Sequence, residues 1–269
     1  MHRPKPNWSM LIIPAKDPLA VGVVAAIRTG DVVSLQRLLE GHPGLATAGI
    51  GDTRDCKGMP RSLLHVVTDW PGHFPNGPAT VAVLIAAGAD VNAQFTGSHT
   101  ETPLHWAASS DDVAVLDALL DAGADIEAVG AVIGGGTPLA DAVAFGQWRA
   151  ARLLVERGAR TTLWQAAALG LMDRVEKHFA TDNPSTLSSW SPRPPQPGAP
   201  LPDEITNAFW CACHGGQRQS AEYLLGQGAD LNWIGYDGLT PVDAARRSDA
   251  GALVEWLVSR GAKSATERK

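Results

Sequence analysis

A unit that recurs along the chain restricts its fold more than any other feature of the sequence. The clearest copy is TPLHWAASSDDVAVLDALLDAGADIEA, residues 102–128, which joins a Thr-Pro-Leu-His box to an alanine pair, a leucine pair and a Gly-Ala-Asp ending. We count seven copies between Pro18 and Ala262, several of them degenerate; the others are AVGVVAAIRTGDVVSLQRLLEGHP, SLLHVV…VAVLIAAGADVNA, TPLADAVAFGQWRAARLLVERGA, LWQAAALGLMDRVEKHF, FWCACHGGQRQSAEYLLGQGADLN and TPVDAARRSDAGALVEWLVSRGA. A unit this short cannot bury an apolar face alone, so the copies predict a stack of repeats.

Each copy has the pattern of two short helices. Thr102 is a natural N-cap, and Pro103 suits the first helical position, where no N–H is needed. Leu116 and Leu119 recur at the spacing that gives the second helix one apolar face. Gly123 can take the left-handed conformation that ends a helix. The sequence therefore predicts an all-α fold of stacked helix pairs.

The unit resembles the ankyrin repeat, through its TPLH box, its alanine and leucine pairs and its Gly-Ala-Asp ending. The resemblance implies an ankyrin-repeat solenoid with long or irregular hairpin loops, in which the first helices line a concave groove. It also implies a binding scaffold. We expect the repeat domain to cover residues 18–263, between an N-terminal arm of residues 1–17 and a flexible C-terminal tail of residues 264–269.

An insertion interrupts the second copy. From the box histidine to the closing glycine there are 18 positions in the third copy, His105 to Gly123, and 23 in the second, His65 to Gly88. The extra residues lie in the stretch TDWPGHFPNG, residues 68–77, whose prolines stop helix propagation. We expect a loop there between the two helices of the repeat, acting either as a functional loop or as a structural brace.

The spacing between copies is also irregular. Successive boxes are 41, 40, 35, 24, 46 and 33 positions apart, against about 33 in a regular ankyrin array. The gap of 24 leaves no room for a hairpin. The gap of 46 holds the Pro-rich segment 188–204, which is expected to be an extended or mobile loop. In this alignment Trp164 and Trp210 replace the box histidine, and we expect both in the core.

Composition argues against several classes of function. The net charge is −6 and the basic residues are scattered, which disfavours nucleic acid or an anionic membrane as partner. No run of about 18 apolar residues is long enough to span a bilayer. Three cysteines, an odd number, fit reduced thiols in the cytoplasm. We expect no metal and no cofactor, and the abundance of Ala, Arg and Gly suggests a bacterial source.

Helical spacing predicts which side chains face the groove of the second to fourth repeats. Positions one and five after the box histidine lie on one helical face, and the neighbouring loops add polar groups. The expected ligand-binding residues are Trp70, Glu101, Trp106, Asp141 and Phe145, and the expected catalytic residues are Asp69, His73 and His99.

Several of these residues have a plain structural alternative. Asp69 with His73 could form the carboxylate-oriented imidazole of a general base, or could brace the insertion. His99 lies outside any box, but a solvated loop histidine is the simpler reading. Glu101 could do no more than favour a helix N-terminus. Trp106 occupies a position that faces the surface in ankyrin repeats, where a tryptophan commonly contacts a ligand.

Other residues with reactive side chains are expected to be structural. His65 and His105 belong to boxes and should bond to neighbouring backbone. Cys211 and His214 share a helical face, the arrangement of an activated thiol, although a chance pairing is favoured. Cys213 falls on the alanine-pair position and is expected in the core.

The sequence leaves more than one hypothesis for function. The first is a binding scaffold that recognises a protein or a small polar ligand through the groove of repeats two to four, whose acidic side favours a basic or hydroxyl-rich ligand. The second is an enzyme (a hydrolase, lyase or isomerase) doing acid–base chemistry on a small polar or sugar-like substrate. The third is binding in the manner of an antitoxin or a host-directed effector. An enzyme requires His73 or His99 within about 3.2 Å of a carboxylate, in a closed pocket.

Overall fold

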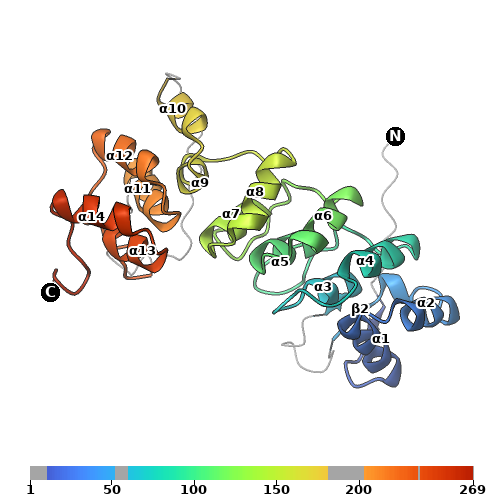
Figure 1. Ribbon diagram of the computed structural model, residues 1–269. Helices are drawn as coiled ribbons and strands as arrows, with labels where there is room; N and C mark the ends of the chain where they lie inside the picture. Colours follow the sequence, from blue (N-terminus) through green and yellow to red (C-terminus); the bar gives the residue numbers. More distant parts are fainter. Residues whose placement is uncertain (1–10, 52–59, 181–202, 236, 269) are drawn as a thin grey trace. The chain divides into compact units, whose positions relative to one another are not determined.

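Helix pairs follow one another along the chain (Figure 1). The computed structural model describes residues 11–51, 60–180, 203–235 and 237–268. Within these ranges fourteen α-helices form seven consecutive pairs, so the seven predicted repeats and the all-α fold are confirmed.

Contacts divide the chain into two compact units, Met1–Gly130 and Ala131–Lys269, where the sequence predicts one repeat domain. The helices of the first unit are α1 (Pro18–Thr29), α2 (Val32–Gly41), α3 (Leu63–Thr68), α4 (Gly77–Ala86), α5 (Pro103–Ser109) and α6 (Val113–Asp121). Those of the second are α7 (Pro138–Ala144), α8 (Trp148–Glu156), α9 (Leu163–Leu169), α10 (Met172–Ala180), α11 (Glu204–His214), α12 (Arg218–Gly226), α13 (Pro241–Arg247) and α14 (Gly251–Ser259).

The first unit has two helical layers. The first helices of its pairs, α1, α3 and α5, pack on one another in a row, and the second helices, α2, α4 and α6, form the other row. Leu35 of α2, Leu64 of α3 and Leu104 of α5 are fully buried. Burying such apolar faces stabilises each pair only when its neighbours are stacked against it.

The box residues cap the first helices and link neighbouring repeats. In α5 the backbone N–H of Thr102 donates to Nδ1 of His105 (3.1 Å). In α3 the Ser62 hydroxyl lies 2.8 Å from Nδ1 of His65, whose Nε2 lies 3.1 Å from the carbonyl oxygen of Glu101 in the next repeat. Both rings are fully buried, which confirms the structural role predicted for His65 and His105.

Helix α9 corrects the alignment of the fifth repeat. Its N-cap is Thr162, whose backbone N–H donates to Oε1 of Gln165 (2.8 Å). The residue at the histidine position is therefore Gln165, and Trp164 stands where Leu104 stands in α5. Trp164 is buried, as expected, but as a core residue of the helix rather than as a substitute for the histidine.

A small sheet fixes part of the predicted N-terminal arm. Strand β1 (Ile12–Ile13) pairs in parallel with β2 (Gly49–Ile50), which pairs antiparallel with β3 (Arg61–Ser62). The arm is thereby held against the loop between α2 and α3. No sequence pattern indicates this sheet, because strands of two residues show no alternation.

Backbone segments approach closely in the second unit. Helix α9 packs against both α7 and α11. Only residues 157–162 link α8 to α9, which confirms that there is no hairpin between the fourth and fifth repeats. A Cβ on Gly215, which follows α11, would lie 1.9 Å from the carbonyl oxygen of Ala168 in α9. The packing of α9 on α11 therefore requires glycine at this position.

Two segments that the sequence predicts to be loop-like or flexible, the Pro-rich segment and the C-terminal tail, make defined contacts in their described residues. Helix α11 begins at Glu204, and Asp203 caps it by accepting from the backbone N–H of Thr206 (2.6 Å), so the end of the Pro-rich segment is helical. Residues 188–202 of that segment lie outside the described ranges. At the C-terminus, the backbone N–H of Ala265 donates to Oδ2 of Asp243 (2.8 Å), which ties the expected flexible tail to α13.

Candidate binding site at the second-repeat insertion

The insertion, residues 69–76, connects α3 to α4 and contacts the first repeat. Nδ2 of Asn76 donates to the carbonyl oxygen of Gly30, the residue that ends α1 (2.9 Å). Gly30 has a φ of 68°, and a Cβ on it would lie 2.2 Å from the carbonyl oxygen of Pro75. The insertion is thus seated directly on the end of α1.

The same insertion contacts the third repeat on its other side. The backbone N–H of His73 donates to Oδ2 of Asp112 (2.7 Å), and Nε2 of His73 lies 3.0 Å from the carbonyl oxygen of Ser110. Asp112 also accepts from the backbone N–H of Val115 and so caps α6. The insertion therefore spans from the first repeat to the third, which is the geometry of a brace.

Asp69 is held by two arginines rather than by His73. Its Oδ2 lies 3.2 Å from Nη2 of Arg28 and 2.5 Å from Nη1 of Arg61. His73 instead faces Asp112, with 4.0 Å between its Nδ1 and Oδ1 of that residue. The general-base pair suggested for Asp69 and His73 is not formed, because the Asp69 carboxylate is occupied by two guanidinium groups.

The two arginines are residues that sequence reasoning missed. Arg28 lies in the last turn of α1 and Arg61 in β3, and neither belongs to a box or to a first-helix surface position. Only the fold brings them to Asp69, so no local signal could have found them.

Trp70 follows Asp69 and points outward. It is 82% exposed, the largest exposed fraction among the large apolar side chains of the described residues. We call Arg28, Arg61, Asp69 and Trp70 the Trp70 corner. The loop that carries this exposed indole is bonded to the repeats on both sides, so the position of Trp70 is fixed by the fold.

A second cluster surrounds Glu101, which is buried at 5% exposure. Its Oε2 accepts a hydrogen bond from Nε1 of Trp106 (2.8 Å). The same oxygen lies 2.7 Å from Nδ1 of His99, but the geometry of this contact is not that of a hydrogen bond. The ring of Phe95 stacks on His99 with 4.9 Å between centroids, and His65 meets Trp106 edge to face at 4.8 Å. Glu101 thus joins a loop to α5 instead of serving only a helix N-terminus.

The Glu101 cluster meets one of the two requirements for acid–base chemistry. The distance between His99 and Glu101 is short enough for proton transfer once the imidazole is oriented. The carboxylate is nevertheless buried and bonded to the indole, and Trp106 is only partly exposed. The cluster therefore has the character of an internal polar network, in which the carboxylate is already engaged, more than that of a pocket with room for a substrate.

We expect Trp106→Phe to lower the free energy of unfolding by about 1–3 kcal/mol, because Glu101 would stay buried with one hydrogen-bond donor fewer. Urea unfolding followed by circular dichroism measures this loss. The matched control is Trp70→Phe at an exposed position, which should change stability by less than about 0.5 kcal/mol. Equal losses in the two variants would mean that the bond between Trp106 and Glu101 does not stabilise the fold.

The two remaining expected site residues belong to the second unit. Asp141 lies in α7 and is fully buried, although its position predicts a side chain facing the groove. Phe145 ends α7 and is 47% exposed. The structure therefore brings together Asp69 and Trp70 at one place, and His99, Glu101 and Trp106 at another, while Asp141 and Phe145 lie in the other unit.

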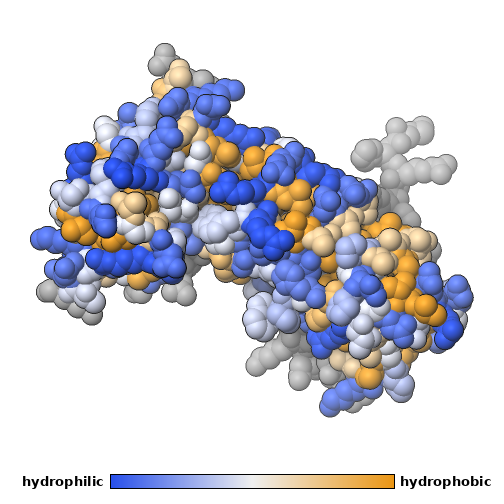
Figure 2. Space-filling model, in the orientation of Figure 1, coloured by the Kyte–Doolittle hydropathy of each residue, from blue (hydrophilic) through white to orange (hydrophobic). Residues whose placement is uncertain are grey.

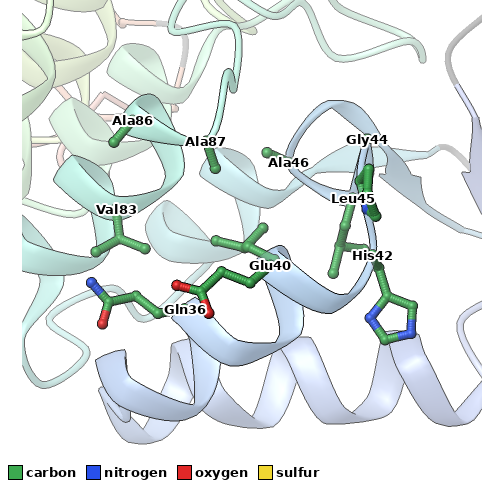
Figure 3. A pocket seen from close by; sticks show the side chains of 11 residues that line it. Gln36, Glu40, His42, Gly44, Leu45, Ala46, Val83, Ala86 and Ala87 are labelled. Atoms are coloured by element: carbon green, nitrogen blue, oxygen red, sulfur yellow. The ribbon is translucent and has the colours of Figure 1, made fainter.

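A hollow of about 500 Å³ opens between α2 and α4, away from every expected site residue (Figure 3). Figure 2 shows hydrophobic surface over these helices. Leu39, Leu45 and Val83 form its apolar walls, and its polar side chains are Gln36, Glu40 and His42. All three polar side chains are exposed to solvent, so the hollow lacks the enclosed polar group that fixes a small ligand.

The second unit has its own buried histidine, His214 of α11. Its Nε2 lies 3.2 Å from the carbonyl oxygen of Val143, and its Nδ1 lies 3.2 Å from Nη2 of Arg247. The ring stacks on Trp210, whose Nε1 donates to the carbonyl oxygen of Leu239. Burial, and next the charge of Arg247, lower the pKa of His214 to about 4. His214 therefore links repeats as a neutral ring.

The thiols of the second unit are not activated. Cys211 and Cys213 are buried and free, and burial raises the pKa of both thiols. A buried thiol with a raised pKa is inert, which agrees with the preference for a chance pairing of Cys211 and His214. Across the described ranges no group of three metal-ligating side chains gathers, and no helix is both long and apolar enough to cross a membrane.

Stacked two-helix units with capped first helices, and with a left-handed glycine after α4, α6, α8, α12 and α14, define a repeat protein. Residues 64–165 match the ankyrin-repeat family, as three copies. An ankyrin repeat and KH domain-containing protein of Caenorhabditis briggsae is 30% identical over 193 residues, and a palmitoyltransferase of Kluyveromyces lactis is 34% identical over 111 residues. This chain is an ankyrin-repeat protein.

The likeness to these relatives covers only a small part of each of them. The aligned regions are 69% and 41% of this chain, but only 7% and 13% of the two relatives. The relatives come from a nematode and a yeast, so they lend no support to a bacterial source. Ankyrin repeats generally mediate protein–protein binding, and that is the class of function the family establishes.

Proposed function

We propose that this protein binds a partner protein through the Trp70 corner of its first unit, next to the groove predicted for repeats two to four. The observation that carries the proposal is Trp70, 82% exposed on a loop that is bonded to the repeats on both sides. Tryptophan is enriched among the residues that dominate binding energy at interfaces.

The bonds of the insertion support this choice. Because Asn76 is fixed to Gly30 and His73 to Asp112, the loop is already ordered before a partner arrives. Binding then costs less conformational entropy than it would for a mobile loop. His73, whose side chain is 55% exposed, adds a polar group on the same insertion.

We expect Trp70→Ala to weaken partner binding about thirtyfold, the effect of removing a central aromatic contact. The measurement is quantitative affinity capture from extracts of cells that make the protein, comparing wild type with the variant by mass spectrometry. The control is Val258→Ala, which removes an exposed apolar side chain of the second unit. Proteins captured by wild type and control but lost with Trp70→Ala support the proposal; identical capture by all three contradicts it.

A second candidate function, an acid–base enzyme, rests on the 2.7 Å contact between His99 and Glu101. It ranks second because the carboxylate also holds Trp106 and is buried. Thermal-shift screening against polar metabolites tests it. Stabilisation of the wild type by a compound that has no effect on His99→Gln would favour the enzyme; no stabilisation by any compound would count against it.

A further inference from the structure

The Trp70 corner carries more positive than negative charge. Two guanidinium groups, those of Arg28 and Arg61, share a single oxygen of Asp69. One unit of positive charge is therefore left over at the corner. The side chains of Arg28 and Arg61 are 48% and 36% exposed, whereas that of Asp69 is 20% exposed, so the positive groups are the ones that face solvent.

The arginines keep donors for a ligand. Each guanidinium has five N–H groups in a planar fork that suits carboxylate oxygens, and the contact with Asp69 engages one nitrogen of each. Arg28 also lies 6.0 Å from the ring of Phe74, and this stacking limits its rotamers. An arginine held in place in this way loses less entropy when it binds an anion.

The carboxylates that suggested an acidic groove do not offset this charge. Asp69 is neutralised by the two arginines. Glu101 is buried and bonded to Trp106, and Asp141 is fully buried in α7 of the second unit. Asp112, the carboxylate next to the insertion, is buried and bonded to the backbone of His73 and of Val115. The preference expected for a basic ligand is therefore reversed at this surface.

We propose that the Trp70 corner binds a short acidic peptide segment of the partner, with a carboxylate on Arg28 and Arg61 and a neighbouring apolar side chain on the indole of Trp70. The inference rests on the proposed function and names the class of its partner. Nucleic acid is the rival polyanion, but the chain has a net charge of −6 and its basic residues are scattered.

Selection from a random linear-peptide display library tests the proposal on the full chain. We expect the enriched peptides to carry Asp or Glu next to an aromatic or aliphatic residue. The best peptide is then titrated by fluorescence anisotropy, as selected and with its Asp and Glu changed to Asn and Gln. The changed peptide should bind at least tenfold more weakly, and this comparison leaves the fold of the protein untouched.

Protein variants locate the contact. Arg28→Gln with Arg61→Gln should weaken the selected peptide at least tenfold, whereas Arg260→Gln, a surface arginine of the second unit stacked on Trp256, should leave binding unchanged. Circular dichroism confirms that the double variant is folded. If it does not fold, Trp70→Ala serves as the locating variant, with the same expected loss.

Other results of these experiments would refute either the acidic partner or the site itself, and the two cases can be told apart. Peptides that depend on Trp70 but lack acidic residues would refute the acidic partner and leave the proposed function standing. Acidic peptides that bind Trp70→Ala as well as wild type would refute the site itself, and so would a library that yields no binder. Tighter binding of a twelve-nucleotide oligothymidylate, in competition with the peptide, would assign the corner to nucleic acid.

Discussion

Gly30→Ala should lower the free energy of unfolding by about 3 kcal/mol, because the new methyl group acts in two ways. Alanine at a φ of 68° is strained, which costs about 1–2 kcal/mol. Its Cβ would also lie 2.2 Å from the carbonyl oxygen of Pro75, and relieving such a contact costs typically 1–3 kcal/mol. The insertion must move away from α1 for the variant to fold.

Gly44→Ala is the matched control for this measurement. Gly44 has a φ of 89°, but no atom lies within 4 Å of a Cβ built there. The Gly44→Ala variant should therefore have the backbone strain without the clash, and its free energy of unfolding should fall by about 1–2 kcal/mol. Urea unfolding of both variants separates the two effects. Equal losses would mean that Pro75 is not seated on Gly30, and the insertion would not be a brace.

The second large effect is destabilisation by acid. Burial lowers the pKa of His65 to about 4, and His214 is shifted to about the same value, against 6.5 for an ordinary histidine. Between these values the unfolded chain binds more protons than the folded one, so stability falls as the pH drops from about 6.5 to about 4. Because of each of these two histidines, the free energy of unfolding should be about 2 kcal/mol lower at pH 5 than at pH 7.

His65→Gln tests the contribution of one ring. Glutamine fills the same position in α9, where Gln165 bonds to Thr162, so the substitution is compatible with the fold. Because glutamine does not titrate, the loss between pH 7 and pH 5 should shrink by about 2 kcal/mol in this variant. His42→Gln, at an exposed position, is the control and should leave the pH dependence unchanged. If His65→Gln lost as much stability as the wild type between pH 7 and pH 5, protonation of His65 would not destabilise the fold.

The repeats could be predicted because each carries local signals with a physical cause. Thr102 and Pro103 mark a helix start and Gly123 its end, and counting from His65 to Gly88 is enough to locate the insertion. The fifth repeat shows the limit of counting. With Gln165 in place of the histidine, counting aligns Trp164 one residue out of register, because no local signal marks the box there.

The side-chain environment of the candidate site could not be predicted in the same way. Sequence proximity pairs Asp69 with His73, four residues away, but its partners are Arg28, 41 residues away, and Arg61 in another element. Glu101 precedes a helix, and only the folding of His99 and Trp106 around it makes it an internal group. Charge pairing between repeats depends on how they stack, and periodicity along one chain does not encode it.

Photo-cross-linking from position 70 shows directly whether Trp70 contacts a partner protein. Trp70 is replaced by the photoreactive residue benzoylphenylalanine in cells that make the protein, and Val258 is replaced in the same way as a control on the second unit. We expect a protein adduct from position 70, with the attachment point in an acidic segment, and no such adduct from position 258. Absence of any adduct at position 70, or the same adducts from both positions, would contradict this expectation.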